Sequence, residues 1–296
     1  MKPLHSSPIN QHPVLHLRAP AKINWFLSVV GKRDDGYHNI RSLMQCISLY
    51  DDLLFHHADT LKVISDADIP LEDNLVYRAA SLLQKYTSCK KGIKIILRKK
   101  IPMSAGLGGG SSDAAYTLLG LNKLWDLGLK KRALCSIGLE IGSDVPFFLD
   151  GPSAIVEGRG EKVKPFKMNS SMVLLIVKPP VSVSTAWAYQ NMKKLTKTPV
   201  DIKLFYQALK KKDFTCLSSM LKNDLERVVA KKYPLVGKMK ERLLEKGAFF
   251  SAMSGSGPTV FGVFGSEKKA FAAAREMGSN WWRVVTTVTN KQVNNK

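Results

Sequence analysis

Hydrophobic and polar positions alternate along residues 15–30. A period of two residues is typical of a β-strand with one face in the core, so we expect a half-buried strand. The turn-rich stretch GKRDDGYHN follows, and the apolar segment 43–54 predicts an antiparallel partner strand. The first strand would carry its apolar and polar positions on opposite faces, with Ile23, Trp25, Leu27 and Val29 on one and Lys22, Asn24 and Ser28 on the other.

Helical periodicity appears further along the chain. Residues 71–86 predict a helix with apolar positions Leu75, Ala79, Leu82 and Leu83. After about residue 165 a second series of elements begins. The other expected elements are a strand at 92–98, helices at 112–127 and 130–139 (ending at Gly142), a strand and turn at 153–163, a strand at 172–178, a helix opening at Ser184, basic helices over 200–246, a strand at 259–264, a helix at 267–277 and a strand near 283–289.

This mixed order of strands and helices predicts an α+β (two-layer α/β) protein. We expect a disordered extension over residues 1–14, one domain over 15–167 and a second over 168–296. A chain of 296 residues with 45% hydrophobic and 23% charged residues is long enough to bury such cores. The sequence holds no apolar run near the roughly 20 residues of a membrane span, so we expect no membrane association.

The cysteines and the N-terminal region bear on location. Cys46, Cys89, Cys135 and Cys216 lie far apart and form no C-x-x-C pair. The first residues, MKPLHSSPINQHPVLH, contain no apolar segment of a secretory signal. Scattered thiols without an export signal are typical of a reduced compartment, so we expect a cytoplasmic protein.

The net charge is strongly positive, since 45 Lys and Arg exceed 24 Asp and Glu by 21. Such a charge is compatible with nucleic acid, a membrane surface or an acidic small substrate. The cations are spread over many segments, among them GIKIILRKK, LKKR and ALKKKD, without interleaved aromatic residues. Solvated helix faces explain this distribution equally well, so the charge alone does not identify a partner.

The segment IPMSAGLGGGSSDAAYTLLGLNKLW, residues 101–125, places a glycine-rich loop between a strand and a helix. The loop is neither a P-loop, which needs Gly-Lys-Ser/Thr, nor a G-x-G-x-x-G dinucleotide fingerprint. We expect Pro102 to end the strand and Ser111 or Ser112 to cap the helix. Asp113 would then lie in the first turn, where a negative charge suits the helix dipole.

A helix that starts after glycines is suited to holding phosphate. Its first N–H groups lack intrahelical acceptors, and glycines allow the backbone to approach a ligand closely. A flexible loop with ordinary capping is the alternative. The predicted phosphate loop consists of Pro102, Met103, Ser104, Ala105, Gly106, Leu107, Gly108, Gly109, Gly110, Ser111 and Ser112.

Together with APAKINWFLSVVGKRDDGYHNIRSLMQ, GSDVPFF and SAMSGSGPTVFGVF, this loop makes the chain resemble the GHMP kinase superfamily from about residue 17 to residue 265. The resemblance implies an ATP-binding N-terminal domain of ribosomal-protein-S5-like topology and a ferredoxin-like C-terminal domain. ATP and substrate would bind between them. PAKIN and GKRDDGYH resemble the member that phosphorylates a hydroxyl of a cytidyl diphosphate substrate in non-mevalonate isoprenoid precursor synthesis.

The resemblance also implies roles for individual residues. Lys22 and Asp144 would form the catalytic pair, with Asp144 as the base; a plain helix N-cap is the alternative interpretation of Asp144. Mg²⁺ is expected with ATP, although we can name no metal ligand. The substrate site is implied to contain Asn24, Tyr37, His38, Thr185 and Tyr189.

Two further features bear on the nucleotide. Asp113 stands where relatives of this superfamily usually carry Asn, and a second glycine turn, residues 254–257, is implied to lie near the nucleotide. The alternatives are a kinase for homoserine, mevalonate or a sugar, and an S5-like RNA-binding protein, whose affinity would fall steeply with salt. We expect no nucleic-acid partner, and a monomer or weak homodimer.

Overall fold

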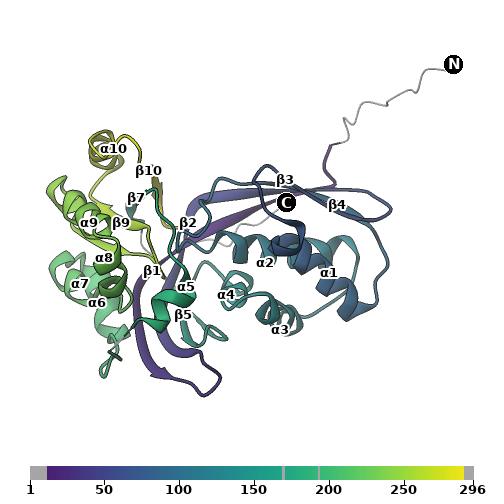
Figure 1. Cartoon of the computed structure of the whole chain (residues 1–296), viewed down its shortest axis with the longest axis horizontal. Helices are drawn as coiled ribbons and strands as arrows, with labels where there is room; N and C mark the ends of the chain where they lie inside the picture. Colours follow the sequence, from purple (N-terminus) through teal and green to yellow (C-terminus); the bar gives the residue numbers. More distant parts are fainter. Residues whose placement is uncertain (1–11, 169–170, 193, 290–296) are drawn as a thin grey trace.

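The computed structural model describes residues 12–168, 171–192 and 194–289, and two β-sheets with their helices make up this part of the chain (Figure 1). Residues 1–11 of the expected N-terminal extension lie outside it. The strands are β1 (Leu15–Lys32), β2 (His38–His56), β3 (Leu61–Ser65), β4 (Ile93–Arg98), β5 (Ser153–Gly158), β6 (Lys162–Pro165), β7 (Val173–Lys178), β8 (Phe250–Met253), β9 (Val260–Phe264) and β10 (Trp282–Thr287).

The helices alternate with these strands in both halves. They are the 3₁₀ turn η1 (Leu71–Asp73) and the α-helices α1 (Leu75–Thr87), α2 (Gly109–Leu124), α3 (Lys131–Ile141), α4 (Val145–Asp150), α5 (Thr185–Gln190), α6 (Ile202–Lys211), α7 (Phe214–Met220), α8 (Glu226–Lys232), α9 (Leu235–Glu245) and α10 (Glu267–Arg275). The predicted α+β class is therefore confirmed, and the predicted helix ending at Gly142 is confirmed as α3.

The first sheet has the order β3-β4-β2-β5-β6, and β1 pairs antiparallel with β2 as predicted. Helices α1, α2, α3 and α4 lie together on one side of it (Figure 1). Leu53 and Phe55 of β2 pack there with Leu118 and Leu121 of α2 in one buried cluster. This layer brings the N-terminal end of α2 close to the middle of β1, where Lys22 N donates to Leu107 O at 2.9 Å.

The second sheet has the order β10-β7-β9-β8, with every neighbouring pair antiparallel. Strand β7 is followed by helices, then by β8 and β9, then by α10 and β10. A β-α-β-β-α-β order along the chain, with the first and third strands at the centre of the sheet, is the ferredoxin-like arrangement. The predicted topology of the C-terminal half is confirmed. The position of the boundary near residue 167 stays a prediction.

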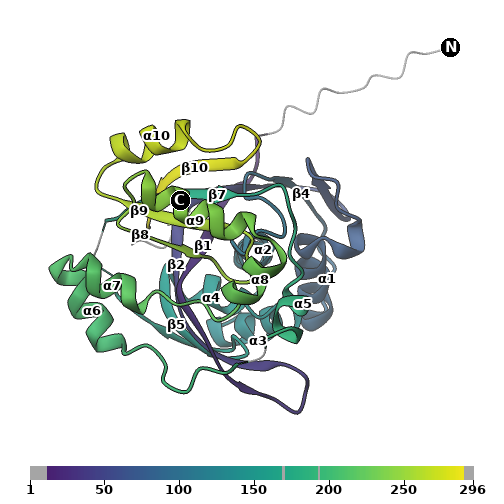
Figure 2. The same cartoon turned by 60° about the vertical axis from the view of Figure 1, so that its left-hand side comes forward.

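The expectation that β1 is half-buried is wrong, because both of its faces are covered. Ile23 and Trp25 are buried with Phe261 of β9, and the Trp25 and Phe261 rings meet edge to face at 5.7 Å. On the opposite face Lys22 and Asn24 are 3% and 1% exposed. Figure 2 shows the long strands β1 and β2 running behind the second sheet. Side chains of β1 still alternate between two faces, but in the middle of the strand both faces are buried, and neither one meets solvent.

The start of α2 also differs from the prediction. The helix begins at Gly109 with Gly108 as N-cap, so Ser111 and Ser112 lie inside the helix and neither caps it. Asp113 consequently falls in the second turn. A Cβ on Gly109 would lie 2.9 Å from Ile101 Cγ2, so the absent side chain lets the helix begin tightly against the loop. Close packing has displaced the start that local capping propensity predicts.

Candidate active site

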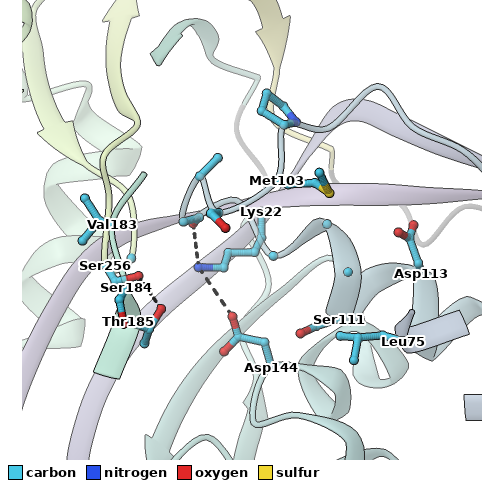
Figure 3. A pocket seen from close by; sticks show the side chains of 18 of the residues that line it. Lys22, Leu75, Met103, Ser111, Asp113, Asp144, Val183, Ser184, Thr185 and Ser256 are labelled. Atoms are coloured by element: carbon cyan, nitrogen blue, oxygen red, sulfur yellow. Dashed lines mark hydrogen bonds and ion pairs between the residues drawn. The ribbon is translucent and has the colours of Figure 1, made fainter. Parts of the chain in front are cut away.

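A cavity of about 590 Å³ opens between the two halves of the molecule (Figure 3). Its walls come from β1, the glycine loop with the start of α2, the residues before α4 and α5, and the second glycine turn. Residues far apart in the sequence therefore share one space. Lys22, Asp144 and Thr185 face this space from three different elements.

The glycine loop forms the floor of the cavity, and all of its predicted residues except Leu107 and Ser112 line it. Leu107 is 1% exposed and Ser112 is fully buried, so their side chains belong to the core. Gly106 and Gly108 have φ values of 73° and 70°, which side chains rarely adopt. The start of α2 directs N–H groups without intrahelical acceptors toward the cavity, which is the arrangement that binds anions.

The second glycine turn packs directly on this loop. Ser254 Oγ donates to Gly106 O at 2.9 Å, and a Cβ on Gly106 would lie 2.2 Å from Ser254 O. The turn is fixed in its own position by Asn223, whose Nδ2 donates to Met253 O and Gly255 O at 2.9 and 2.8 Å. Sequence analysis did not identify Asn223. No periodicity or spacing in the segment 222–226 indicates that role.

Lys22 lies in the centre of the cavity wall, held mainly by neutral oxygens. Its Nζ donates to Asn24 Oδ1 at 2.6 Å and to Gly106 O at 3.0 Å, and lies 3.6 Å from Asp144 Oδ2. Burial lowers the pKa of Lys22, and the charge of Asp144 opposes that change only in part. One partly exposed carboxylate is therefore not enough to offset the cost of burying the positive charge of Lys22.

Asp144 precedes α4 and faces Lys22. It occupies the N-cap position, yet its side chain makes no capping hydrogen bond. Its carboxylate is 30% exposed and points into the cavity toward the ammonium group (Figure 3). Asp144 is therefore the N-cap residue of α4 by position only, and its carboxylate contacts Lys22 instead of capping the helix.

Asn24 is fixed in one orientation by its neighbours. Its Nδ2 donates to Ser42 Oγ at 2.7 Å, and that hydroxyl donates to Phe26 O at 2.6 Å. The amide oxygen must therefore face Lys22, because the amide nitrogen is already committed. Lys22 and Asn24 lie on the same face of β1, as their spacing predicts.

The predicted substrate residues of α5 reach the same cavity. Thr185 and Tyr189 both line it, and the Thr185 and Ser256 hydroxyl oxygens are 2.8 Å apart. The ring of His38 stacks on Tyr189 with centroids 5.3 Å apart and an interplanar angle of 28°. Burial raises the pKa of Tyr189, with a further contribution from the charge of Asp144.

Tyr37 is placed differently from the other aromatic residues. It is 52% exposed, does not line the cavity, and has the Arg159 guanidinium 5.1 Å from its ring centroid. His38, and not Tyr37, is therefore the ring against Tyr189. Tyr37 lies in the turn that connects β1 to β2.

The cavity continues past the glycine loop into a region that the sequence did not predict. Ile69, Asn74, Leu97 and Lys99 line this far end, next to Met103 of the predicted loop. Asn74 caps α1, since its Oδ1 accepts from Val76 N at 3.0 Å. Its sequence signal is that of a helix start, and only the fold brings it to the cavity.

Within residues 12–168, 171–192 and 194–289, no group of three or more His, Cys, Asp or Glu side chains is arranged to hold a metal ion. In the same ranges, none of the helices combines the length and the apolar character needed to span a membrane.

Two family descriptions match the chain. "GHMP kinases N terminal domain" matches residues 74–152, which include the glycine loop, and "GHMP kinases C terminal" matches residues 205–283. Both matches lie in the order expected from the sequence.

Close relatives cover nearly the whole chain. A protein of Thermodesulfovibrio yellowstonii named 4-diphosphocytidyl-2-C-methyl-D-erythritol kinase is 48% identical, over 93% of this chain and 98% of its own length. A protein of the same name from Geobacter metallireducens is 43% identical, over 92% and 97% respectively.

Solved structures agree with the sequence comparisons. The crystal structure of a 4-(cytidine 5'-diphospho)-2C-methyl-D-erythritol kinase has a TM-score of 0.82 at 31% identity, over 93% of this chain and 99% of that one. A homoserine kinase from Cytophaga hutchinsonii has a TM-score of 0.70 at 20% identity, which shows a shared fold.

Proposed function

The chain belongs to the GHMP kinase family, and from that premise we propose that it transfers a phosphoryl group from ATP to the 2-hydroxyl of 4-diphosphocytidyl-2-C-methyl-D-erythritol. It is an ATP-dependent small-molecule kinase of non-mevalonate isoprenoid precursor synthesis. The identity of 48% over almost the full length of a relative with that name supports this substrate.

The observation that carries the proposal is the position of Lys22 and Asp144 beside the glycine loop. Lys22 Nζ lies 3.0 Å from Gly106 O and 3.6 Å from Asp144 Oδ2, so an acid and a cation meet at the floor where phosphates would bind. Phosphoryl transfer requires mainly positioning and stabilisation of charge. The partly exposed carboxylate of Asp144 can position the substrate hydroxyl, and the ammonium group of Lys22, which has few counter-charges, can stabilise the charge of the transferred phosphoryl group.

The reaction follows from these positions. The substrate hydroxyl oxygen would attack the γ-phosphorus, the bond between that phosphorus and the β,γ-bridging oxygen would break, and ADP would leave. Asp144 would orient the hydroxyl and accept its proton. Lys22 would stabilise the charge on the transferred group, and N–H groups at the start of α2 would hold the ATP phosphates.

Magnesium is proposed as part of the nucleotide substrate. Mg²⁺ keeps several waters and commonly binds through substrate phosphates with one or two carboxylates. The described residues bring no three acidic, His or Cys side chains together, which fits an ion carried by ATP better than a closed protein site.

The two ends of the cavity suggest where each ligand lies. Thr185 and Tyr189 stand beside Lys22 and Asp144, so we assign the cytidyl substrate to this end, with Asn24 and His38 beside it and Tyr37 at its rim. The far end, with Asn74 and Lys99, would receive the nucleobase of ATP. We further propose a cytoplasmic enzyme that acts as a monomer or weak homodimer.

The test is ADP release by the purified protein with ATP and Mg²⁺. The alcohols to compare are 4-diphosphocytidyl-2-C-methyl-D-erythritol, homoserine, mevalonate and galactose. We expect turnover with the cytidyl substrate alone. Turnover with one of the other alcohols would support the kinase activity and refute the assignment of the cytidyl substrate.

A variant separates the chemistry from binding. Asp144→Asn should lower kcat by about 10²- to 10⁴-fold while ATP still binds. Asp150→Asn, at the other end of α4, is the matched control and should be near normal. Normal turnover by Asp144→Asn would remove it as the base.

A further inference from the structure

A buried cluster of one lysine and two aspartates lies beneath the start of α2. Lys99 Nζ bonds to Asp51 Oδ2, and it lies 2.7 Å from Asp113 Oδ2. Asp51 is fully buried, Asp113 is 2% exposed, and the Lys99 side chain is 10% exposed. Two carboxylates therefore share one ammonium group in a region that solvent hardly reaches.

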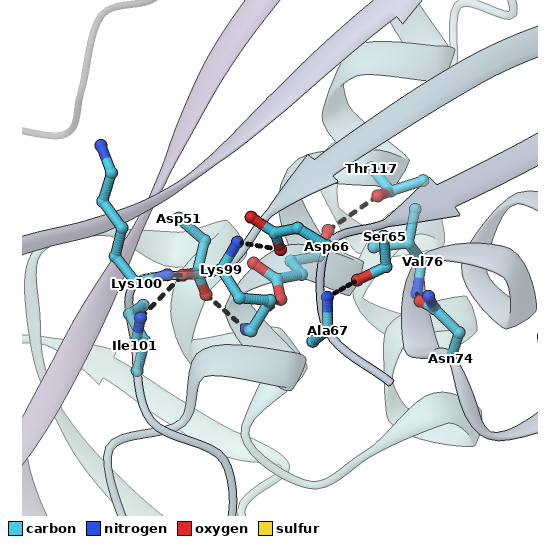
Figure 4. Close-up of polar contacts among 11 residues, drawn as sticks. Asp51, Ser65, Asp66, Ala67, Asn74, Val76, Lys99, Lys100, Ile101 and Thr117 are labelled. Carbon is cyan, nitrogen blue, oxygen red and sulfur yellow. Dashed lines mark hydrogen bonds and ion pairs between the residues drawn. The ribbon is translucent and has the colours of Figure 1, made fainter. Parts of the chain in front are cut away.

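The two carboxylates are not equivalent. Asp51 Oδ1 also accepts the backbone N–H groups of Lys100 and Ile101, at 2.5 and 2.8 Å (Figure 4). Asp113 Oδ1 is buried and, within the described part of the chain, has no hydrogen-bond partner. Asp113 is therefore the acid whose negative charge is poorly compensated, and a buried uncompensated charge is costly.

This cluster is adjacent to the proposed phosphate site. Lys99 and Asp113 both line the cavity, and a Cβ on Gly109 would lie 3.3 Å from Lys99 Nζ. Gly109 is the first residue of α2, whose N–H groups would hold the phosphates of ATP. A charged Asp113 would repel those phosphates, while a neutral Asp113 would not.

Other charged groups near the cluster do not compensate Asp113. Lys22 on β1 is committed to Asn24 and Gly106, and Asp66, after β3, contacts the backbone N–H of Lys99. Asp73, in η1, lines the cavity and adds another negative charge.

We propose that Asp113 takes up a proton from solvent when the nucleotide binds, so that its neutral carboxyl accompanies the phosphates. The step converts the carboxylate and one proton into a carboxylic acid and changes no other bond. Asp113 is a positioning residue that acts through Lys99 and through its own charge. This inference rests on the proposed use of ATP.

The electrostatics of the cluster agree with this geometry. Burial raises the pKa of Asp113 to about 7, an effect that Lys99 opposes and the charge of Asp51 reinforces. Near neutral pH the carboxyl is then divided between its two forms. A polyanion bound nearby would raise the pKa of Asp113 further, since a like charge favours the neutral acid.

The experiment measures the binding of ADP with Mg²⁺ by isothermal titration calorimetry, in the absence of the second substrate. At pH 7, titrations in buffers of different ionisation enthalpy give the number of protons taken up. We expect roughly half a proton for the unmodified protein, because a group with a pKa near the ambient pH is half protonated. For Asp113→Asn we expect none beyond the titration of the ligand itself.

The affinity should show the same difference. From pH 6 to pH 8.5, the affinity of the unmodified protein should fall about 3-fold or more relative to that of Asp113→Asn, since the proton must be recovered at high pH. Asp126→Asn, just after the C-terminal end of the same helix, is the matched control and should follow the unmodified protein. Titration of the ligand is common to all three and cancels.

Two results would overturn the inference. Binding of ADP with equal pH dependence and equal proton uptake in all three proteins would show that Asp113 is structural, and would leave the proposed function intact. Failure of ADP to bind to any of them at any pH would overturn the proposed function together with the inference. The proton count on the unmodified protein keeps the test valid even if Asp113→Asn does not fold.

Discussion

Two lysines with largely buried side chains, Lys22 and Lys99, line the same cavity, and their surroundings differ. Lys22 is held by two neutral oxygens and has one partly exposed carboxylate at 3.6 Å, and its pKa is lowered by burial. Lys99 is held by two buried carboxylates. Burial alone would lower the pKa of Lys99, but the charges of Asp113 and Asp51 outweigh it and raise that pKa.

One protein can therefore use the same type of side chain for two purposes. A cation that is already saturated with carboxylates has little attraction left for a ligand and serves the structure. A cation with too few counter-charges gains more from an arriving phosphate, so it is suited to chemistry. We therefore expect loss of Lys99 to affect mainly stability and loss of Lys22 to affect mainly turnover.

The largest effect is expected for Lys99→Met. It leaves two carboxylates buried without their cation, and such a change costs about 3–5 kcal/mol of unfolding free energy. Urea denaturation measures it. Lys100→Met is the control, because that lysine is 63% exposed and its pair with Asp52 is worth at most about 1 kcal/mol. Equal losses for both variants would contradict the comparison.

Lys22→Met should lower kcat by about 10²- to 10³-fold, equivalent to about 3–4 kcal/mol of transition-state stabilisation. Its partners Asn24 and Gly106 are neutral, so we expect a smaller loss of unfolding free energy than for Lys99→Met. Single-turnover kinetics and urea denaturation of the same preparation measure both quantities. A stable variant with normal turnover would refute the proposed role of Lys22.

Asp113→Asn should change the pH dependence of stability. Because the pKa of Asp113 is raised to about 7, the folded protein binds more protons than the unfolded chain between about pH 4 and pH 7. The contribution of that proton to the free energy of unfolding is fully present below about pH 4. It decreases as pH rises and is lost once pH passes about 7. The variant should therefore gain on the order of 1–3 kcal/mol relative to the unmodified protein between pH 5 and pH 8. A constant difference would contradict this.

Tyr37→Ala should give the smallest effect and should concern the substrate end alone. Loss of one exposed aromatic contact is worth about 0.5–1.5 kcal/mol, so the KM for the cytidyl substrate should rise roughly 2- to 10-fold. The KM for ATP should not change, because Tyr37 lies in the turn between β1 and β2 and is not among the residues that line the cavity with the glycine loop. An unchanged KM for the cytidyl substrate would leave Tyr37 as a turn residue.

Local sequence patterns predicted most of the secondary structure, since periodicity and turn residues act within a few positions. They also placed Lys22 and Asn24 together on one face of β1, which the hydrogen bond between them confirms. The pairing of Lys22 with Asp144 came from the family resemblance, because no local signal links residues so far apart.

The errors have a common physical origin. The expectation of a half-buried β1 was wrong because the sequence does not reveal that the two glycine turns cover the face that carries Lys22 and Asn24. Ser111 and Ser112 are residue types that favour helix caps, but α2 begins earlier, at Gly109, where a Cβ would lie only 2.9 Å from Ile101 Cγ2 and 3.3 Å from Lys99 Nζ. Lys99 and Asn74 reach the cavity through tertiary packing alone, so their local sequence carried no functional signal.

The burial of β1 and β2 against the C-terminal sheet has a consequence for synthesis on the ribosome. Ile23, Trp25 and Ile47 emerge early, but Phe250 and Phe261, which cover them, are made near the end of the chain. At about 5–20 residues per second, that apolar face waits on the order of ten seconds or more. Until then the N-terminal half exposes apolar surface that it cannot cover by itself, because this part of the core is completed only by residues of the C-terminal half.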